Sequence, residues 1–240
     1  MNILLASLGH MSECFVATCL LKKLSKQGDV YVATVFDSTA DVFEYSKYVK
    51  KVFTLKHRQD EENLLLNHYD LLINLSPSIN DSLLNVDKCV GINYTDPKDK
   101  YKNILYGNKK TNKNMFQIYN QLAGMSWRGE GADVNYKPRN KSVKNRTGIL
   151  LSNYNLKEYL YTELKLKESR LWYIPQKQHI HKKMDEINRC KRIITDDFLT
   201  LNIALFLRKE VYFLKTINYN FKIELFGSGK VFDVPKHFLQ

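Results

Sequence analysis

The chain has 240 residues, a mass of 28.2 kDa and 44% hydrophobic residues, enough for one large domain or two small ones, each with a core. This composition excludes a disordered chain. The formal net charge of +12 favours an anionic partner. No apolar run approaches the roughly 18–20 residues that a membrane-spanning helix needs, and the N-terminus lacks signal-peptide features. We therefore expect a cytoplasmic protein, either free or peripheral at the inner membrane surface.

The four cysteines have neither a CxxC pairing nor the spacing of a zinc ribbon. They are Cys14, Cys19, Cys89 and Cys190. Reduced, mostly buried thiols are the expectation, with no disulfide framework and no metal site.

Short apolar segments alternate with helical patterns through the first half of the chain. Strands are predicted at residues 2–6, 30–35, 52–55, 69–75 and 89–92. Helices are predicted at residues 15–24, 41–48 and 115–122. Strands that are apolar on both faces and alternate with helices indicate a parallel sheet that is covered on both sides.

The same alternation resumes in the second half of the chain. Strands are predicted at residues 148–151, 171–174, 192–195 and 211–214, and helices at residues 156–166, 181–190 and 200–207. Residues 227–230 (GSGK) lack the spacing of a phosphate-binding loop and are predicted to form an ordinary turn. The fold class is therefore α/β, with two βαβ sheets.

A basic segment joins the two halves. Residues 98–146 contain twelve Lys/Arg and three acidic residues, and residues 136–146 are the predicted linker. We place the domains at residues 1–140 and 141–240. The basic segment could be a solvated face, a site for the phosphates of a glycan or membrane surface, or a nucleic-acid contact. Lys109, Lys110 and Lys113 are its candidate acceptor contacts.

Two loops are candidates for chemistry, because ligands of open α/β sheets bind beyond the carboxyl ends of the strands. Residues 7–13 (SLGHMSE) bring a carboxylate into a first helical turn, with Ser12 as a potential helix cap. Residues 195–202 (TDDFLTLN) place acids and a hydroxyl at a similar junction. Neither loop has the GxGxxG or GxxxxGK[ST] pattern, which argues against hydride transfer and P-loop kinase chemistry.

These segments, in this order, resemble the heptosyltransferase-like (ADP-heptose:LPS heptosyltransferase) family of glycosyltransferases. Residues 1–13 (MNILLASLGHMSE) are similar to the family's opening strand, Ser/Gly loop and helix entry. YDLLINL at 69–75 resembles its "YDLVIDL" strand, KCVGI at 88–92 its "KRIGF" strand, and TDDFLTLNIA at 195–204 its "TNDTGPMHLA" element.

The resemblance implies the GT-B fold, with two Rossmann-like domains whose parallel sheets face each other across a cleft. It implies inverting, metal-independent transfer of a sugar from a nucleotide-diphosphate sugar, which is the donor substrate, with no further cofactor. The first-choice acceptor is an anionic, lipopolysaccharide-like glycan. The N-terminal domain is expected to bind the acceptor and the C-terminal domain the donor.

The resemblance also assigns residues in the N-terminal loop. Glu13 stands where the family has its catalytic Asp and would remove the proton from the acceptor hydroxyl. The acceptor-side loop residues are Ser7, Gly9, His10 and Ser12, where Ser12 replaces the usual Gly. A carboxylate in a first helical turn is also favoured by the helix dipole alone, by about 0.3–1 kcal/mol.

In the C-terminal half, Asp197 aligns with a conserved Asp of the family, and a helix N-terminus would hold the donor diphosphate. The donor-binding residues on this basis are Asp197, Thr200, Leu201, Asn202 and Lys157. Leu199 replaces a Gly and Asn202 replaces a His of the family's motif.

Two alternatives remain open. One keeps the fold and makes the acceptor DNA or RNA, which the +12 charge favours. The other is a catalytically silent relative that acts as a binding subunit, which the replaced Gly and His favour.

Overall fold

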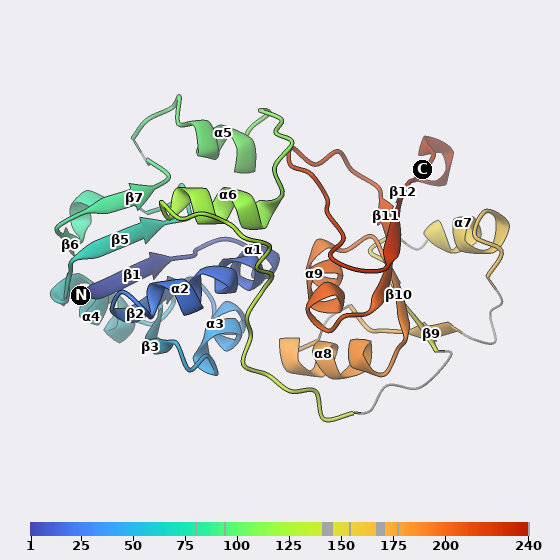
Figure 1. Ribbon diagram of the computed structural model, residues 1–240, viewed down its shortest axis with the longest axis horizontal. Helices are drawn as coiled ribbons and strands as arrows, with labels where there is room; N and C mark the ends of the chain where they lie inside the picture. Colours follow the sequence, from blue (N-terminus) through green and yellow to red (C-terminus); the bar gives the residue numbers. More distant parts are fainter. Residues whose placement is uncertain are drawn as a thin grey trace. The chain divides into compact units, whose positions relative to one another are not determined.

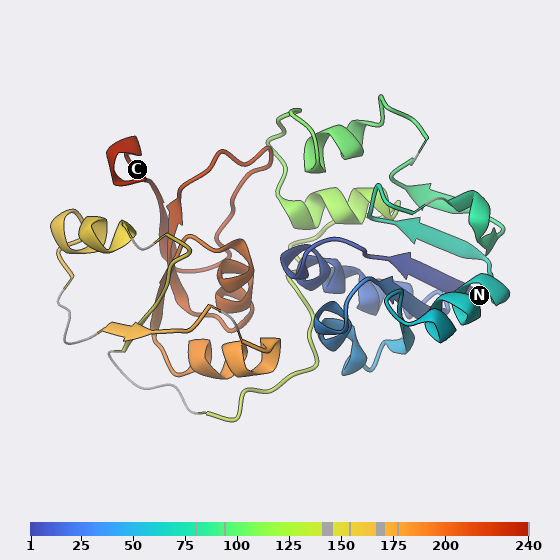
Figure 2. The same ribbon diagram turned by 180° about the vertical axis from the view of Figure 1, so that it is seen from behind.

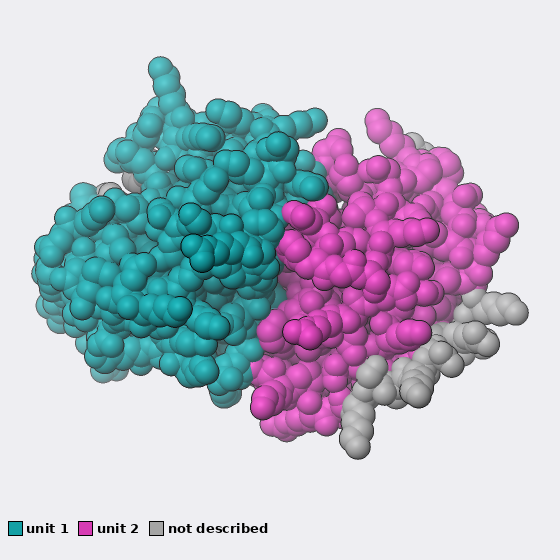
Figure 3. Space-filling model, viewed as in Figure 1, with its two compact units in different colours: residues 1–135, 219–222 teal, residues 136–218, 223–240 magenta. Residues whose placement is uncertain are grey.

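The computed structural model describes residues 1–79, 81–93, 95–140, 146–153, 155–166, 171–176 and 178–239. Its contacts divide the chain into two compact units (Figure 3). Unit 1 comprises Met1–Asn135 and Tyr219–Lys222, and unit 2 comprises Tyr136–Asn218 and Ile223–Gln240. The division lies a few residues before the expected boundary at 140, and a short segment from the C-terminal half joins unit 1.

Unit 1 is built on a five-stranded parallel sheet with the strand order β3-β2-β1-β5-β7 (Figure 1). Its strands are β1 (Asn2–Ala6), β2 (Asp29–Thr34), β3 (Val49–Thr54), β5 (Leu71–Asn74) and β7 (Cys89–Gly91). Ile3 of β1 pairs with Val30 on one side and Leu71 on the other. The strand order therefore reverses between β1 and β5, which makes this the switch point of the sheet.

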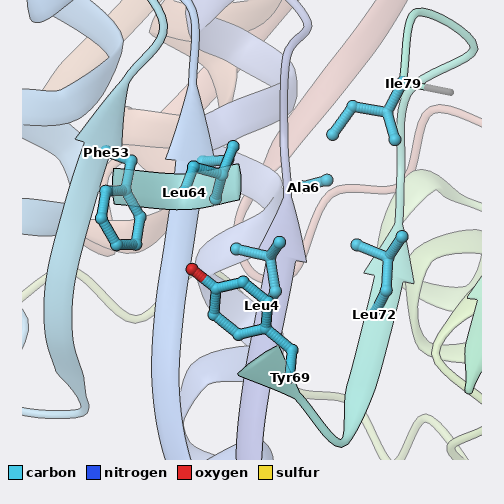
Figure 4. Close-up of a cluster of buried hydrophobic side chains, with 8 residues drawn as sticks. Leu4, Ala6, Phe53, Leu64, Tyr69, Leu72 and Ile79 are labelled. Atoms are coloured by element: carbon cyan, nitrogen blue, oxygen red, sulfur yellow. The ribbon is translucent and has the colours of Figure 1, made fainter. Parts of the chain in front are cut away.

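Helices cover both faces of this sheet. One group of helices is centred on α1, which contacts both α3 and α6. The group comprises α1 (Met11–Ala17), η1 (Thr18–Leu20), α2 (Leu21–Leu24), α3 (Asp37–Glu44) and α6 (Met115–Leu122). The helix α4 (Arg58–Leu66) packs against β3 and lies on the near side in Figure 2. Its Leu64 joins a buried cluster with Leu4 and Phe53 (Figure 4).

The rest of unit 1 is shorter elements. These are β4 (His68–Tyr69), which pairs with β6 (Asn85–Val86), together with η2 (Asp81–Leu83) and α5 (Lys100–Leu105). The segment Tyr219–Lys222 is held to the connection between α5 and α6 by two backbone hydrogen bonds, from Thr111 N to Asn220 O at 2.7 Å and from Lys222 N to Lys113 O at 2.9 Å.

Unit 2 has a second five-stranded parallel sheet, with the order β12-β11-β10-β8-β9. Its strands are β8 (Thr147–Leu150), β9 (Leu171–Tyr173), β10 (Arg192–Thr195), β11 (Glu210–Lys215) and β12 (Gly229–Asp233). Its helices are α7 (Leu156–Thr162), α8 (Ile180–Asn188), α9 (Phe198–Phe206) and the short η4 (Lys236–Phe238). The strand order reverses between β8 and β10, so this pair forms the second switch point.

The α/β architecture with two parallel sheets is confirmed, and several details differ from expectation. The first helix is split into α1, η1 and α2, and α3 begins at Asp37 because the extended Phe36 precedes it as N-cap. Residues 227–228 lie in a bend rather than a regular turn, and Gly229 and Lys230 begin the edge strand β12. The helices α4 and α5 were not predicted. Within the described residues, no helix has the length and apolar character that a membrane crossing requires.

Candidate functional site

The site in unit 1 lies at the carboxyl end of β1, beside the switch point with β5. Residues 7–10 leave the strand, and α1 begins at Met11 with His10 as its N-cap. This corrects the expectation that Ser12 caps the helix, since Ser12 lies inside the first turn. Glu13 is the acidic residue of that turn.

The Glu13 carboxylate turns back toward the start of the helix. Its Oε2 atom accepts a hydrogen bond from the backbone N–H of His10 at 2.7 Å. The hydroxyl of Tyr106, which follows α5, lies within hydrogen-bonding reach of the same carboxylate and 3.3 Å from the carbonyl oxygen of Leu75. Because a phenol carries a single proton, Tyr106 can serve only one of these two acceptors at a time.

The surroundings of Glu13 change its acidity. Burial raises the pKa of Glu13 above its ordinary value, and the hydrogen bonds from His10 and Tyr106 oppose this by lowering the pKa. Burial of the hydroxyl and the neighbouring Glu13 raise the pKa of Tyr106, so this phenol remains a proton donor. A carboxylate with a raised pKa is a better base than an exposed one, which suits the removal of a hydroxyl proton.

Gly9 makes room for this carboxylate. A Cβ atom placed on Gly9 would lie 1.9 Å from Oε2 of Glu13 and 2.8 Å from its carboxyl carbon. Any larger residue at position 9 must therefore displace the Glu13 side chain.

The other loop residues lie differently. Ser7 is buried, and its hydroxyl contacts the Sγ atom of Cys14 at 3.5 Å, so its side chain faces the interior rather than a ligand. His10 is exposed, and Ser12 is half-buried in the first turn of α1. Of the loop residues in the prediction, Gly9 and His10 are the two that contact Glu13.

The three lysines predicted to contact the acceptor, Lys109, Lys110 and Lys113, lie between α5 and α6. Lys109 and Lys110 are exposed. The Lys113 ammonium donates to Oε1 of Gln121 at 2.8 Å and lines a polar hollow of about 590 Å³. Tyr101, Gln117 and Trp127 also line this hollow.

In unit 2, a buried carboxylate connects the two strands of the switch point. Asp196 follows β10 and is 5% exposed. It accepts hydrogen bonds from the backbone N–H of Ser152, at 2.7 Å, and from the Ser152 hydroxyl, and Ser152 follows β8. Asp196 therefore holds the two loops together at the edge of the sheet where a ligand is expected.

The adjacent Asp197 is the N-cap of α9. Its Oδ2 atom accepts hydrogen bonds from the N–H and the hydroxyl of Thr200, at 2.8 and 2.5 Å. Thr200 is fully buried, and Asn202 donates to the carbonyl oxygen of Phe198 at 2.8 Å. Leu201 is 2% exposed, so its side chain packs in the interior. Four of the residues predicted to bind the sugar donor are therefore adjacent at the start of α9: Asp197, Thr200, Leu201 and Asn202. Their polar side chains form hydrogen bonds with one another or within the helix.

Lys157 lies in the first turn of α7 and lines a cavity of about 160 Å³ with Tyr173 and Gln176. Its Nζ atom is 5.0 Å from the centroid of the Tyr173 ring, in cation–π geometry.

One group of side chains in the described part of the chain has the composition of a metal site. The candidate ligand atoms of His68, Asp70 and Asp87 all lie within 4.8 Å of one another. These residues lie at the amino end of β5, so they are at the opposite edge of the sheet from Glu13. His68 and Asp87 are exposed and already paired, at 3.0 Å.

The sequence patterns did not indicate Tyr106 or the Asp196–Ser152 pair as parts of a site. Tyr106 was visible only as one of several aromatic residues in a basic segment, and Asp196 only as one of two adjacent acids. Both form contacts between segments that are far apart in the chain.

Comparison with solved structures shows the fold of the heptosyltransferases. The E. coli heptosyltransferase WaaC with ADP-2-deoxy-2-fluoro heptose matches with a TM-score of 0.62 and 11% identity, over 98% of this chain and 94% of WaaC. E. coli ADP-heptose LPS heptosyltransferase II matches with a TM-score of 0.64 and 12% identity, over 98% of this chain and 91% of that protein. A family 9 glycosyltransferase from Veillonella parvula matches with a TM-score of 0.65 and 12% identity, over 97% of this chain and 86% of that protein. No family model and no curated protein matches the sequence. The chain thus has a GT-B-type fold over nearly its whole length.

Proposed function

We propose that this chain is a glycosyltransferase that moves a sugar from a nucleotide-diphosphate sugar to the hydroxyl of an anionic, lipopolysaccharide-like glycan. The observation that carries this proposal is the Glu13 carboxylate, half-buried at the switch point of a heptosyltransferase-like fold. The neighbouring structures include one that is described with ADP and one that is named an LPS heptosyltransferase. Their names suggest the donor and acceptor classes.

In this mechanism, Glu13 takes the proton of the acceptor hydroxyl while the hydroxyl oxygen attacks the anomeric carbon of the donor. The new carbon–oxygen bond forms as the bond from that carbon to the diphosphate breaks, and the nucleoside diphosphate leaves. A single displacement of this kind inverts the anomeric configuration. Positive charge develops on the sugar in the transition state, and negative charge grows on the leaving diphosphate.

The leaving group is assigned to unit 2. The N-terminal end of α9 offers backbone N–H groups and the positive end of the helix dipole. Most of the excess positive charge of the sequence also lies in unit 2, whereas unit 1 has nearly as many acidic as basic residues. This distribution favours an anionic donor on unit 2.

We also propose that no metal takes part in the transfer, because a helix N-terminus and lysines can compensate the charge of a diphosphate. His68, Asp70 and Asp87 lie at the other edge of the sheet and have no role in this mechanism.

The test is a binding and turnover assay with ADP-, UDP-, GDP- and CDP-sugars, with and without EDTA. We expect one nucleoside diphosphate to raise the melting temperature of the protein more than the other three do. We also expect EDTA-resistant turnover, with a product of inverted anomeric configuration by NMR. If a nucleoside diphosphate binds and no acceptor supports turnover, the silent binding subunit becomes the better description.

A further inference from the structure

Two hollows in the surface of unit 1 adjoin each other, because Met125 and Ser126 line both of them. One is the polar hollow that Lys113 lines. The other, the basic cavity, has a volume of about 620 Å³ and is lined by Lys23 and its neighbours on α2. Glu13 lines neither of them, and the ten residues of helix from Glu13 to Lys23 span about 15 Å. The basic cavity is therefore separate from the Glu13 site.

The basic cavity carries an excess of positive charge. Four basic and two acidic side chains line it, namely Lys22, Lys23, Lys26, Arg128, Glu130 and Asp133. The side chains of Lys22, Lys26 and Arg128 are exposed, and among the described residues no group accepts a hydrogen bond from them or forms an ion pair with them. Three cations without a protein partner thus meet at one cavity, which favours an anionic ligand.

The fourth cation, Lys23, fixes the wall of the basic cavity. Its ammonium group donates to Oδ1 of Asn120 and to the carbonyl oxygen of Ser126, each at 2.7 Å, and pairs with Oε1 of Glu130 at 2.9 Å. These contacts use all three N–H donors of the ammonium group. Lys23 therefore ties α2 to α6 and to residues 126–130, and it compensates the charge of Glu130. The cavity is held in shape before any ligand binds.

The adjoining polar hollow offers amide donors. Gln117 and Gln121 are four residues apart and share one face of α6. Oε1 of Gln121 accepts from the Lys113 ammonium at 2.8 Å, and Oε1 of Gln117 accepts from the backbone N–H of Asn114 at 3.0 Å. Within the described part of the chain, neither amide nitrogen donates to the protein, so their N–H groups are available to the hydroxyl groups of a ligand.

Trp127 adds an aromatic ring to the polar hollow. Its indole N–H donates to the carbonyl oxygen of Glu130 at 2.8 Å, which fixes the orientation of the ring. An aromatic face of this kind can pack against the C–H groups of a sugar ring, while amides bind the sugar's hydroxyl groups. Since Arg128 follows Trp127 directly and lines the basic cavity, a sugar on Trp127 lies close to the unpartnered cations.

We infer that the polar hollow and the basic cavity together form a second glycan-binding site, which holds an anionic sugar residue of the acceptor away from the hydroxyl that reacts at Glu13. The polar hollow takes the sugar ring, and Lys22, Lys26 and Arg128 bind its phosphate or carboxylate group. This inference rests on the proposed function. It adds three cations to which the resemblance assigns no role.

The experiment titrates the full chain with a deacylated lipopolysaccharide core oligosaccharide, which carries phosphate and carboxylate groups. Trp172→Phe removes the only other tryptophan of the chain, so fluorescence then reports on Trp127 alone. In this background, the double variant Lys26→Gln with Arg128→Gln should bind the oligosaccharide about tenfold or more weakly, because two charge-assisted contacts are lost.

The matched control is the double variant Lys88→Gln with Arg58→Gln. It removes the same charge from two other exposed positions of unit 1 and should bind as the parent does. Inorganic phosphate and phosphatidylglycerol vesicles test other sources of the anion. The oligosaccharide should bind more tightly than either of them. An equal loss in the control, or binding of vesicles without binding of the oligosaccharide, would overturn the inference.

A pair of variants at Trp127 separates a sugar contact from a structural role. Trp127→Phe and Trp127→Leu both lose the hydrogen bond to Glu130, but only Phe keeps an aromatic face. Calorimetric titration should therefore show tighter oligosaccharide binding by the Phe variant than by the Leu variant. Equal affinities would remove the polar hollow from the site. If a Trp127 variant does not fold, the exposed Lys26 and Arg128 positions decide the inference.

Steady-state kinetics distinguishes this inference from the proposed function. In the Lys26 and Arg128 double variant, KM for the oligosaccharide acceptor should rise by about tenfold, because the lost contacts bind substrate and transition state equally. The kcat value and the affinity for the nucleoside diphosphate should be unchanged. Wild-type KM and wild-type affinity in the folded variant would overturn the inference and leave the proposed function standing. If the wild type binds no nucleoside diphosphate and transfers no sugar, the proposed function fails, and the inference fails with it.

Discussion

Gly9 and Glu13 share one small space at the end of β1. A Cβ atom on any other residue at position 9 would lie only 1.9 Å from the Oε2 atom of Glu13, which is too close for both atoms to be accommodated. The same oxygen accepts the His10 N–H. The loop backbone and the first turn of α1 together therefore set the position of the carboxylate.

Substitution of Gly9 by Ala should lower kcat by about tenfold or more, because the methyl group displaces the carboxylate from its position and small displacements of a catalytic group cost up to about 100-fold. Steady-state kinetics would show this. Gly131→Ala is the matched control, since a Cβ atom there meets nothing within 4 Å. Unchanged kcat in Gly9→Ala would mean that the observed carboxylate position is not the active one.

Substitution of Glu13 by Gln should reduce transfer by about 10²–10⁴-fold, the usual contribution of a general base. Glutamine can still accept the His10 N–H, so the helix start should persist. Titration should show unchanged binding of the nucleoside diphosphate. Glu61→Gln, an exposed acid in the first turn of α4, should retain full activity.

The acid limb of the pH–rate profile should move when Tyr106 is replaced by Phe. The hydrogen bond from Tyr106 lowers the pKa of Glu13, so its removal should raise that pKa further. The base then needs a higher pH to ionise, and kcat/KM should rise at a higher pH than in the wild type. Tyr101→Phe, at the other end of α5, should leave the profile unmoved.

The stability of Glu13→Gln should exceed that of the wild type by an amount that grows with pH. A folded-state pKa above the unfolded value gives stability that is present below the unfolded pKa and is lost as pH rises through the folded pKa. Glutamine does not ionise and avoids this loss. Urea unfolding at pH 4 and pH 8 measures the difference, and a gap that shrinks with pH would contradict the raised pKa.

Asp197→Ala should lower the free energy of unfolding of unit 2 by about 1–2 kcal/mol, since it removes the N-cap of α9 and leaves the buried Thr200 groups without their acceptor. Asp197→Asn keeps an acceptor oxygen and should lose much less. Denaturation monitored by circular dichroism distinguishes the two variants. Equal losses would mean that the charge matters more than the cap.

The sequence alone determined the fold class of this protein. The near-continuous apolar run YDLLINL at 69–75 is typical of a strand covered on both sides, and Leu71–Asn74 of this run form β5, whereas Tyr69 belongs to β4. The alternation with helices then implied parallel sheets, and parallel sheets place their loops at the carboxyl ends of the strands. This reasoning indicated the loops at residues 7–13 and 195–202, and the family resemblance then assigned Glu13 and Asp197 within them.

Only the tertiary structure decided which groups surround those residues. The helix α4 is weakly patterned and is held by one buried side chain, Leu64. Tyr106 reaches Glu13, and Ser152 reaches Asp196, across many intervening residues. Lys183 occupies an apolar position on α8, where the sequence pattern alone would place a hydrophobic residue. Contacts of this kind depend on how the helices pack on the sheet, and no local pattern of residues encodes that packing.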